Sequence, residues 1–278
     1  MSSTFLKACS IRSSDAILTQ HLFARAYYVN LDRRTDRREY MEAMLKRQCI
    51  PATRFAACTP ATPEVAKLLE VDAHEDLRLL PGMTASGISH LHLWRICASQ
   101  PPGDDAAMLV LEDDVMLLQR WRAELAQCLR KAPIDWELLY LDAWPGSCCW
   151  HFPFGCARKP AELLLADDCR FTSAYLIRPS AARWLIARQT EAPHLRHESL
   201  LIELQQRGRS WHTLPKLALQ LWDDVSDIAS DAVSVATRNF YRDTYFPVFP
   251  RALYDAGVTH YEAVAKKLTP AFTPSHYS

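Results

Sequence analysis

Residues 109–115 read LVLEDDV, an apolar run that ends in three consecutive acids. The apolar part is typical of a buried strand. Burying several carboxylates is costly unless a cation or hydrogen bonds compensate for the lost solvation. At the carboxyl end of a central strand in an α/β sheet, these acids would face the crevice where ligands bind. The stretch therefore predicts a central strand with a charged site at its end.

Side chains alternate along a strand, so we expect Glu112 and Asp114 on one face and Asp113 on the other. Two acids aimed at one point form a hard oxygen site suited to Mn²⁺ or Mg²⁺. Such a site commonly holds a substrate diphosphate. The same residues also fit a solvated acidic turn, and the stretch by itself does not separate the two interpretations.

Strands and helices alternate on both sides of this stretch. Residues 26–31 (AYYVNL) predict a strand, and a helix follows whose buried face carries Tyr40, Met41, Met44 and Leu45. Asp32 or Thr35 is available to cap that helix. We expect further strands at 108–115, 137–142, 171–177 and near 211–221, and helices at 90–98, 120–131, 179–189 and 198–207.

This alternation predicts an α/β fold with a mainly parallel sheet flanked by helices. We expect residues 51–81 to be irregular, because prolines interrupt them, and residues 144–170 to form a long loop region. The predicted organisation is a mobile segment at 1–22, one domain at 23–237 and an aromatic-rich segment at 238–278 that packs on the domain.

The composition is that of an ordinary globular protein without a strong field. The chain has 278 residues, 49% of them hydrophobic, and its 32 basic and 32 acidic residues give a formal charge of zero. A neutral chain does not favour nucleic acid or an anionic membrane, so any site for a polyanion must be local. No apolar run approaches the roughly 20 residues that span a bilayer.

The cysteines indicate the compartment. Nine cysteines follow no disulfide pattern, and residues 1–20 lack the apolar core of a secretory signal. We therefore expect free thiols and a cytoplasmic or cytosol-facing protein without a signal peptide. A local cluster has no spacing common in zinc sites, and its cysteines are interpreted as buried or half-buried thiols. It consists of Cys148, Cys149, Cys156 and Cys169, with His151 beside them.

An arginine-rich segment follows the first predicted strand. Residues 30–38 read NLDRRTDRR, at a strand end and a helix start, where backbone amides and guanidinium groups both favour an anion. Four arginines in six positions cannot all face one ligand, so we expect one or two in the crevice and the others solvated or paired with neighbouring acids. The segment also fits an exposed, charged helix start.

Five motifs in a fixed order carry a resemblance that runs from about Tyr27 to Ala229. They are NLDRRTDRR, SHLHLW, LVLEDDV, FTSAYLIRPSAARWL and VSDIA. Their series resembles glycosyltransferase family 25, the group of bacterial lipooligosaccharide galactosyltransferases and procollagen galactosyltransferases. The resemblance implies a GT-A-like (Rossmann-like) fold, a UDP-sugar donor, a divalent metal and inversion at the anomeric carbon.

The resemblance also assigns residues. The opening motif corresponds to Asn30, Leu31, Arg34, Asp36 and Arg37; the later motifs correspond to Ser89, His90 and Trp94, to Glu112, Asp113 and Asp114, and to Ser226 and Asp227. Two departures stand out. The family's Gly-x-x-Gly-Cys before Ser-His keeps only Gly82, with Ala85 and Ser86 at the next two places, and its Asp-Glu pair reads His197-Glu198 here.

These residues define the predicted chemistry. We expect Glu112 and Asp114 to bind Mn²⁺ or Mg²⁺, and Asp113 to contact the ribose or stabilise the loop. Asn30, Arg34, Arg37, Ser89 and His90 complete the predicted donor site. Inversion needs a base near the acceptor hydroxyl, for which Glu198 is the first candidate and Asp227 the second.

The predicted reaction moves galactose or glucose from a UDP-sugar to a hydroxyl of a glycan or protein. The metal would act as a Lewis acid on the leaving UDP. One alternative is a catalytically silent member that binds a sugar nucleotide or a glycan. A second is a nucleic-acid-associated protein that uses residues 33–38, which the neutral net charge disfavours.

Overall fold

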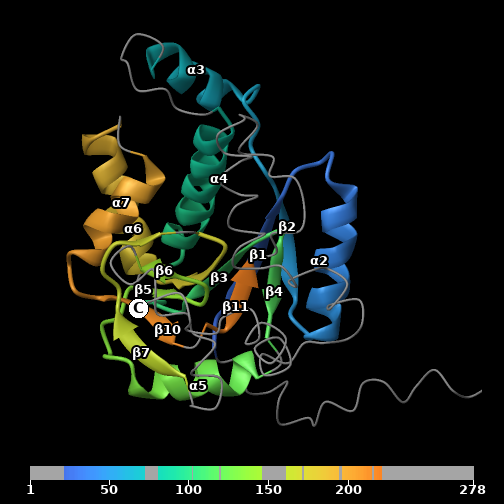
Figure 1. The fold of residues 1–278 in the computed structure, drawn as a ribbon. Coiled ribbons are helices and arrows are strands. Elements are labelled where there is room, and N and C mark those ends of the chain that lie inside the picture. The colour runs from blue at the N-terminus through green and yellow to red at the C-terminus, as the bar shows by residue number, and fades with distance from the viewer. Residues whose placement is uncertain are drawn as a thin grey trace, which may run out of the picture.

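A computed structural model of the chain describes residues 22–72, 81–101, 103–118, 120–145, 161–170, 172–193, 196–214 and 216–220. Its centre is a seven-stranded sheet (Figure 1). The strand order is β2 (Ala52–Ala56), β1 (Arg25–Asn30), β3 (Met108–Glu112), β9 (Ala174–Ile177), β5 (Leu138–Tyr140), β10 (Ser210–Leu214) and β7 (Glu162–Leu165).

Five of these strands run in one direction. β1 pairs in parallel with β2 and β3, β5 pairs in parallel with β10, and β9 and β7 run antiparallel to their neighbours. The predicted α/β fold with a mainly parallel sheet is confirmed, and it is compatible with a GT-A-like Rossmann fold. β9 lies between β3 and β5, where it interrupts the parallel order in the middle of the sheet.

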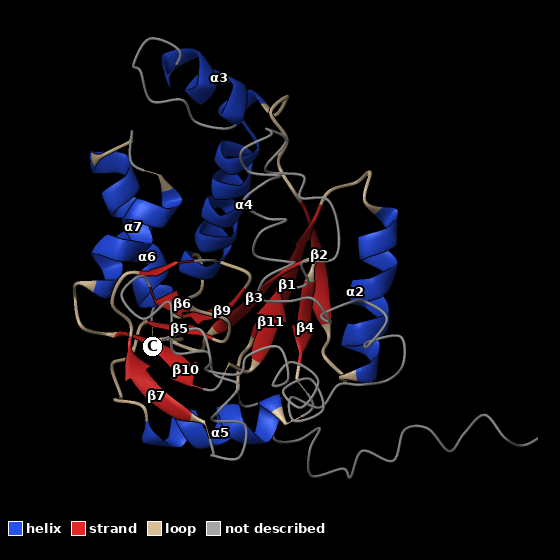
Figure 2. Ribbon diagram, in the orientation of Figure 1, coloured by secondary structure: helices blue, strands red, loops and turns tan. Residues whose placement is uncertain are grey.

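Helices cover both faces of the sheet (Figure 2). α2 (Thr35–Arg47) and α5 (Trp121–Lys131) belong to the core on one face, whereas α4 (Pro81–Ala98), α6 (Pro179–Glu191) and α7 (His197–Gln205) belong to the core on the other. α3 (Pro63–Asp72) packs against α4. Because both faces are covered, the first four residues of β3 are all apolar, with Leu109 and Leu111 in one core and Met108 and Val110 in the other.

Two small sheets complete the described part. β4 (Val115–Leu117) pairs antiparallel with β11 (Ala218–Gln220), and β6 (Trp144–Pro145) pairs antiparallel with β8 (Cys169–Arg170). The chain turns at Asp113 and Asp114 between β3 and β4. β11 therefore brings Gln220 opposite Val115, next to the acids.

The prediction that residues 51–81 are irregular was wrong. β2 is an edge strand whose residues are half-buried or exposed, so it lacks the apolar alternation that marks a strand, and its pairing with β1 defines it instead. Pro63 begins α3, where a proline costs nothing because the first amide of a helix has no partner within it.

Other boundaries also differ from expectation. α4 begins at Pro81, nine residues before the predicted start at 90, and α2 has Arg34 at its N-cap without a side-chain cap from Asp32 or Thr35. Within the expected loop at 144–170, the ends form β6, β7 and β8. Residues 1–21 and 221–278, and with them the expected terminal segments, lie outside the described residues.

The described residues also bear on the expectations about membrane spans and cysteines. None of the helices in the described ranges is both long and apolar enough to cross a bilayer. Five cysteines in the described ranges are free thiols: Cys49, Cys58, Cys97, Cys128 and Cys169. Cys148, Cys149, His151 and Cys156 lie outside those ranges.

Candidate functional site

A cleft of about 410 Å³ opens at the carboxyl ends of β1 and β3. Its walls come from the end of each strand, from the turn at 113–114, from the first half of α4 and from Gln220 of β11. This is the place where open α/β sheets bind ligands, and all three acids of residues 112–114 line it. The sequence therefore located the cleft correctly.

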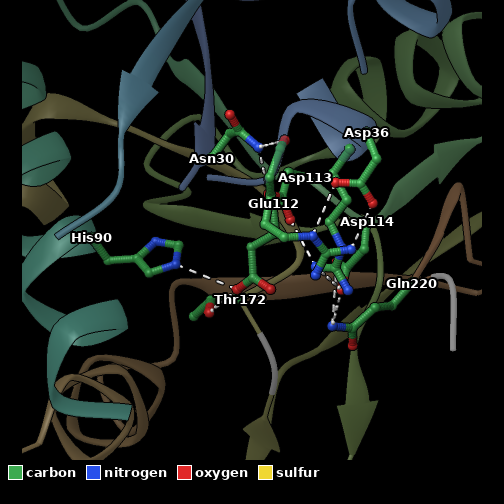
Figure 3. Close-up of polar contacts among 10 residues, drawn as sticks. Asn30, Asp36, His90, Glu112, Asp113, Asp114, Thr172 and Gln220 are labelled. Carbon is green, nitrogen blue, oxygen red and sulfur yellow. Dashed lines mark hydrogen bonds and ion pairs between the residues drawn. The ribbon is translucent and has the colours of Figure 1, made fainter. Parts of the chain in front are cut away.

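Asp113 and Asp114 lie next to each other (Figure 3), and Arg37 joins them. Nη1 of Arg37 lies 2.8 Å from Oδ1 of Asp113 and 3.1 Å from Oδ2 of Asp114. Asn30 donates a further hydrogen bond of 2.7 Å from Nδ2 to Oδ2 of Asp113. Because both oxygens of Asp113 are engaged in this way, its contacts within the protein stabilise the turn.

Glu112 has different partners. Its Oε1 accepts a hydrogen bond of 2.8 Å from Oγ1 of Thr172 and lies 3.4 Å from Nε2 of the fully buried His90. The expectation that Glu112 and Asp114 share one face while Asp113 takes the other was wrong in detail. β3 ends at Glu112, and the turn that follows places Asp113 and Asp114 together on Arg37.

Burial dominates the electrostatics of the turn. It raises the pKa of Asp114 to about 7, against the opposing effect of Arg37. Burial also raises the pKa of Asp113, again opposed by Arg37. For Glu112, burial acts in the same direction, but the contacts with His90 and Thr172 outweigh it and the pKa is lowered. The cleft thus concentrates negative charge that a cation would stabilise.

The arginines divide as the sequence analysis expected. Arg33 and Arg37 line the cleft, whereas Arg34 forms a two-bond contact of 2.9–3.0 Å with Asp36. Arg38 pairs with Glu42 at 2.9 Å. Arg33, rather than the predicted Arg34, is therefore the second arginine of the cleft wall.

Asn30 and Ser89 line the cleft but are also tied to the protein. Oδ1 of Asn30 accepts a hydrogen bond of 2.9 Å from Arg54. Oγ of Ser89 donates to the carbonyl of Ala85 and accepts from the amide of Cys58, which fastens α4 to the segment after β2. Ala85 lies at the family's second glycine position, and it lines the cleft together with Gly82 and Ser86.

The sequence analysis missed an ion pair close to the turn, which Asp142 forms with Lys216. Asp142 accepts hydrogen bonds from Nζ of Lys216 at 2.6 Å, from Oγ of Ser173 at 2.9 Å and from the amide of Gln220 at 2.9 Å. The Gln220 side chain then reaches Asp114 at 3.3 Å. The one available signal was that the predicted strand at 137–142 also ends in an acid.

A second cavity of about 360 Å³ lies at the start of α7. Polar groups on its wall include Glu198, Ser199, Arg196 and Thr172. Thr172 is the hydrogen-bond donor to Glu112, which lines the first cleft. A residue of the second cavity's wall, Thr172, is thus hydrogen-bonded to a residue of the first cleft, Glu112.

His197, the departure from the family's acidic pair, is a packed residue. Its ring stacks on that of His90, with the two planes at 4° and the centroids 5.8 Å apart, and it faces Gly87 of α4. Burial lowers the pKa of His197 to about 3, so the imidazole is neutral at neutral pH and a poor base. Of the two residues, Glu198 is the better candidate base. Ser226 and Asp227 lie outside the described residues.

The comparison with known families agrees with this geometry. Residues 23–200 match the family described as Glycosyltransferase family 25 (LPS biosynthesis protein). A search of curated proteins gave no match. The family match covers more than half of the chain and contains the cleft acids, Arg37, His90 and Glu198. The chain therefore belongs to glycosyltransferase family 25, and it is a glycosyltransferase by family.

Proposed function

We propose that this glycosyltransferase moves a hexose, galactose or glucose, from a UDP-sugar to a hydroxyl of a glycan or protein, with inversion and with Mn²⁺ or Mg²⁺. The observation that carries the proposal is the cleft at the carboxyl end of β3, which is lined by one buried carboxylate, that of Asp113, by two half-buried ones, those of Glu112 and Asp114, and by two arginines. An anionic ligand that brings its own cation would complement both signs of charge.

The carboxylates of Glu112 and Asp114 are hard oxygen ligands of the kind that a divalent cation takes. No group of three His, Cys, Asp or Glu side chains that could hold a metal occurs among the described residues, so the protein alone does not complete a coordination shell there. Glu112 and Asp114 would hold the cation, and diphosphate oxygens would supply further hard ligands. When bound, the cation would supply positive charge to the leaving diphosphate.

The arginines would bind and orient the donor. Arg33 and Arg37 line the cleft and can donate to the diphosphate, while Asp113 holds Arg37 in place at 2.8 Å. Asn30 keeps Asp113 and the following turn fixed through its 2.7 Å hydrogen bond. By holding Arg37 and the turn in one arrangement, these contacts would preorganise the site for a phosphate group.

The acceptor would enter the second cavity. Its wall offers carboxylate, hydroxyl and guanidinium groups, which suit the many hydroxyls of a glycan, and its Thr172 is hydrogen-bonded to Glu112 of the first cleft. Glu198 would accept the proton of the attacking hydroxyl. The family description favours a glycan of lipopolysaccharide as the acceptor.

His197 gives the catalytically silent alternative its support. It stands where the family places an acid, and it is neutral and packed against Gly87. The intact acids 112–114 favour an active enzyme over this alternative. The nucleic-acid alternative is disfavoured because Arg34 and Arg38 are paired with Asp36 and Glu42.

The deciding experiment measures Mn²⁺-dependent release of UDP from UDP-galactose and UDP-glucose. We expect release by the wild type and a loss of at least about 100-fold in Asp114→Asn, because the cation loses a carboxylate that stabilises charge. Asp135→Asn is the matched control, since the Asp135 side chain is 58% exposed and forms a surface ion pair with Arg209. Full activity of Asp114→Asn, or full activity of the wild type in excess EDTA, would contradict the metal assignment.

A further inference from the structure

Three buried side chains connect α4 and β9 to Glu112. Nε1 of Trp94 lies 3.0 Å from the hydroxyl of Tyr175, that hydroxyl lies 2.9 Å from Nδ1 of His90, and Nε2 of His90 lies 3.4 Å from Oε1 of Glu112. Trp94, Tyr175 and His90 each have no exposed surface. His90 and Trp94 are four residues apart in α4, which places them one turn apart on the same face of the helix.

The tryptophan determines where the phenol proton points. An indole N–H can only donate, so the oxygen of Tyr175 must accept from Trp94. The hydroxyl proton of Tyr175 then has His90 Nδ1 as its acceptor at 2.9 Å. If Nδ1 carried a proton instead, the phenol proton would be left without this acceptor in a fully buried place, which is unfavourable.

The other end of the histidine leads to the same conclusion. With Nδ1 accepting, the neutral ring carries its proton on Nε2, which faces the carboxylate oxygen of Glu112 at 3.4 Å. In the opposite tautomer, a nitrogen lone pair would face that oxygen, and two acceptors would repel each other. Both neighbours of His90 therefore favour the Nε2–H tautomer.

We propose that Trp94 and Tyr175 fix His90 as the Nε2–H tautomer, and that His90 in this form orients the carboxylate of Glu112 toward the cleft. His90 and Thr172 both contact Oε1 of Glu112. These two contacts therefore hold the carboxylate by one oxygen and do not involve Oε2. Trp94, Tyr175 and His90 are thus positioning residues for the cation and diphosphate, an inference that rests on the role proposed for Glu112.

The stacking of His197 supports the same arrangement. Its ring covers one face of His90 with the two planes at 4°, which restrains His90 against rotation about its side-chain bonds. Gly87 makes room for this ring, because a Cβ at that position would lie 2.5 Å from Nδ1 of His197. The histidine is therefore held by a hydrogen bond at one end and by packing on its face.

The test compares Tyr175→Phe with the wild type by ¹⁵N NMR of histidine-labelled protein, with the His90 signals assigned through a His90→Gln variant. We expect the Nε2–H tautomer in the wild type and loss of its dominance in Tyr175→Phe. Binding of UDP with Mn²⁺, measured by calorimetry, should weaken by about 10- to 100-fold, as when partners of a metal-binding residue are removed.

Tyr140→Phe is the matched control. Tyr140 is a buried tyrosine on the neighbouring strand β5, directly opposite Tyr175, and its hydroxyl accepts from Gln205 and not from the Glu112 chain of contacts. It should lose a similar amount of stability but keep both the His90 tautomer and the binding of UDP with Mn²⁺. If Tyr175→Phe does not fold, Trp94→Phe removes the donor that directs the phenol proton and should give a mixture of tautomers.

Each outcome decides the inference. An Nδ1–H tautomer in the wild type overturns it, as does a Tyr175→Phe protein whose tautomer or ligand affinity matches the wild type. Equal weakening of binding in Tyr140→Phe overturns it too, since the effect would then be general destabilisation. If the wild type binds neither Mn²⁺ nor UDP, the proposed function fails, and the NMR result still decides whether the tautomer is fixed.

Discussion

Arg37 sets the charge balance of the cleft at the scale of single residues. It contacts Asp113 and Asp114, whereas the carboxylate of Glu112 contacts Thr172 and His90. A divalent cation between the two acids would therefore meet Asp114, whose charge is partly compensated by Arg37, and Glu112, whose contacts are with Thr172 and His90. With this asymmetry, Glu112 would be the stronger electrostatic partner of the proposed cation.

The first prediction at the scale of single residues is that Glu198 is the catalytic base. Glu198→Gln keeps the size of the side chain but removes its basicity, so kcat should fall by about 10²–10⁴ while the KM for the UDP-sugar stays nearly unchanged. Steady-state kinetics with both donors checks this. Glu191→Gln, at a side chain of α6 that is 70% exposed, is the control.

Asp227 provides the opposing outcome. If Glu198→Gln lowers turnover by less than about fivefold while Asp227→Asn removes it, the base is Asp227 and Glu198 stabilises the first turn of α7.

At the scale of elements, β9 and α4 do most to build the site. β9 inserts antiparallel between β3 and β5, so the residues just before it reach both neighbours: the carbonyl of Ser173 accepts from the amide of Glu112, and its hydroxyl donates to Asp142. α4 supplies Ser89 to the cleft wall and His90 to Glu112. An antiparallel strand in the middle of the sheet thereby links the acids of two parallel strands.

The packing of α4 against α7 can be tested at Gly87. In an exposed helix, Gly→Ala would stabilise by about 0.5–1 kcal/mol. Here the added Cβ would lie 2.5 Å from the ring of His197, so we expect Gly87→Ala to destabilise by about 1–3 kcal/mol and to lower turnover through displacement of the start of α7. Urea unfolding and steady-state kinetics measure the two effects.

A double variant provides the control for this prediction. Gly87→Ala combined with His197→Ala removes the ring that the new methyl group meets, so the two changes should not add. A Gly87→Ala protein more stable than the wild type would show that the ring moves aside at no cost, and that α4 and α7 do not depend on this contact.

At the scale of the whole molecule, packing in the core explains why four of the described cysteines are buried free thiols. Cys58, Cys97, Cys128 and Cys169 are buried within the helix-covered layers and are free, and burial raises the pKa of the Cys97 thiol to about 12. Such thiols are inert to oxidation because the thiolate is the reactive form. They contribute to packing as small apolar groups.

The corresponding prediction concerns the compartment. We propose a cytoplasmic or cytosol-facing protein, because unpatterned free thiols are typical of a reducing environment. Thiol titration of the denatured, unreduced protein should find all nine cysteines of the chain. A shortfall of one or more pairs would reveal native disulfides and contradict the compartment.

The sequence by itself determined the features that depend on local pattern. The continuous apolar run of 108–111 requires cover on both faces, the four apolar residues of α2 fall on one helix face, and the acids 112–114 must end their strand at a polar crevice. Each of these follows from the period of a strand or helix and from the cost of burying charge. They were enough to predict the α/β fold and to locate the cleft.

The tertiary structure alone decided which groups meet there. Thr172 reaches Glu112 across 60 residues of sequence, Tyr175 reaches His90 across 85 and Gln220 reaches Asp114 across 106. No local period encodes such pairs, because they depend on the direction of β9 and on the turn after β3. For the same reason the sequence placed the three acids at one edge of the sheet but could not tell which of them Arg37 would join.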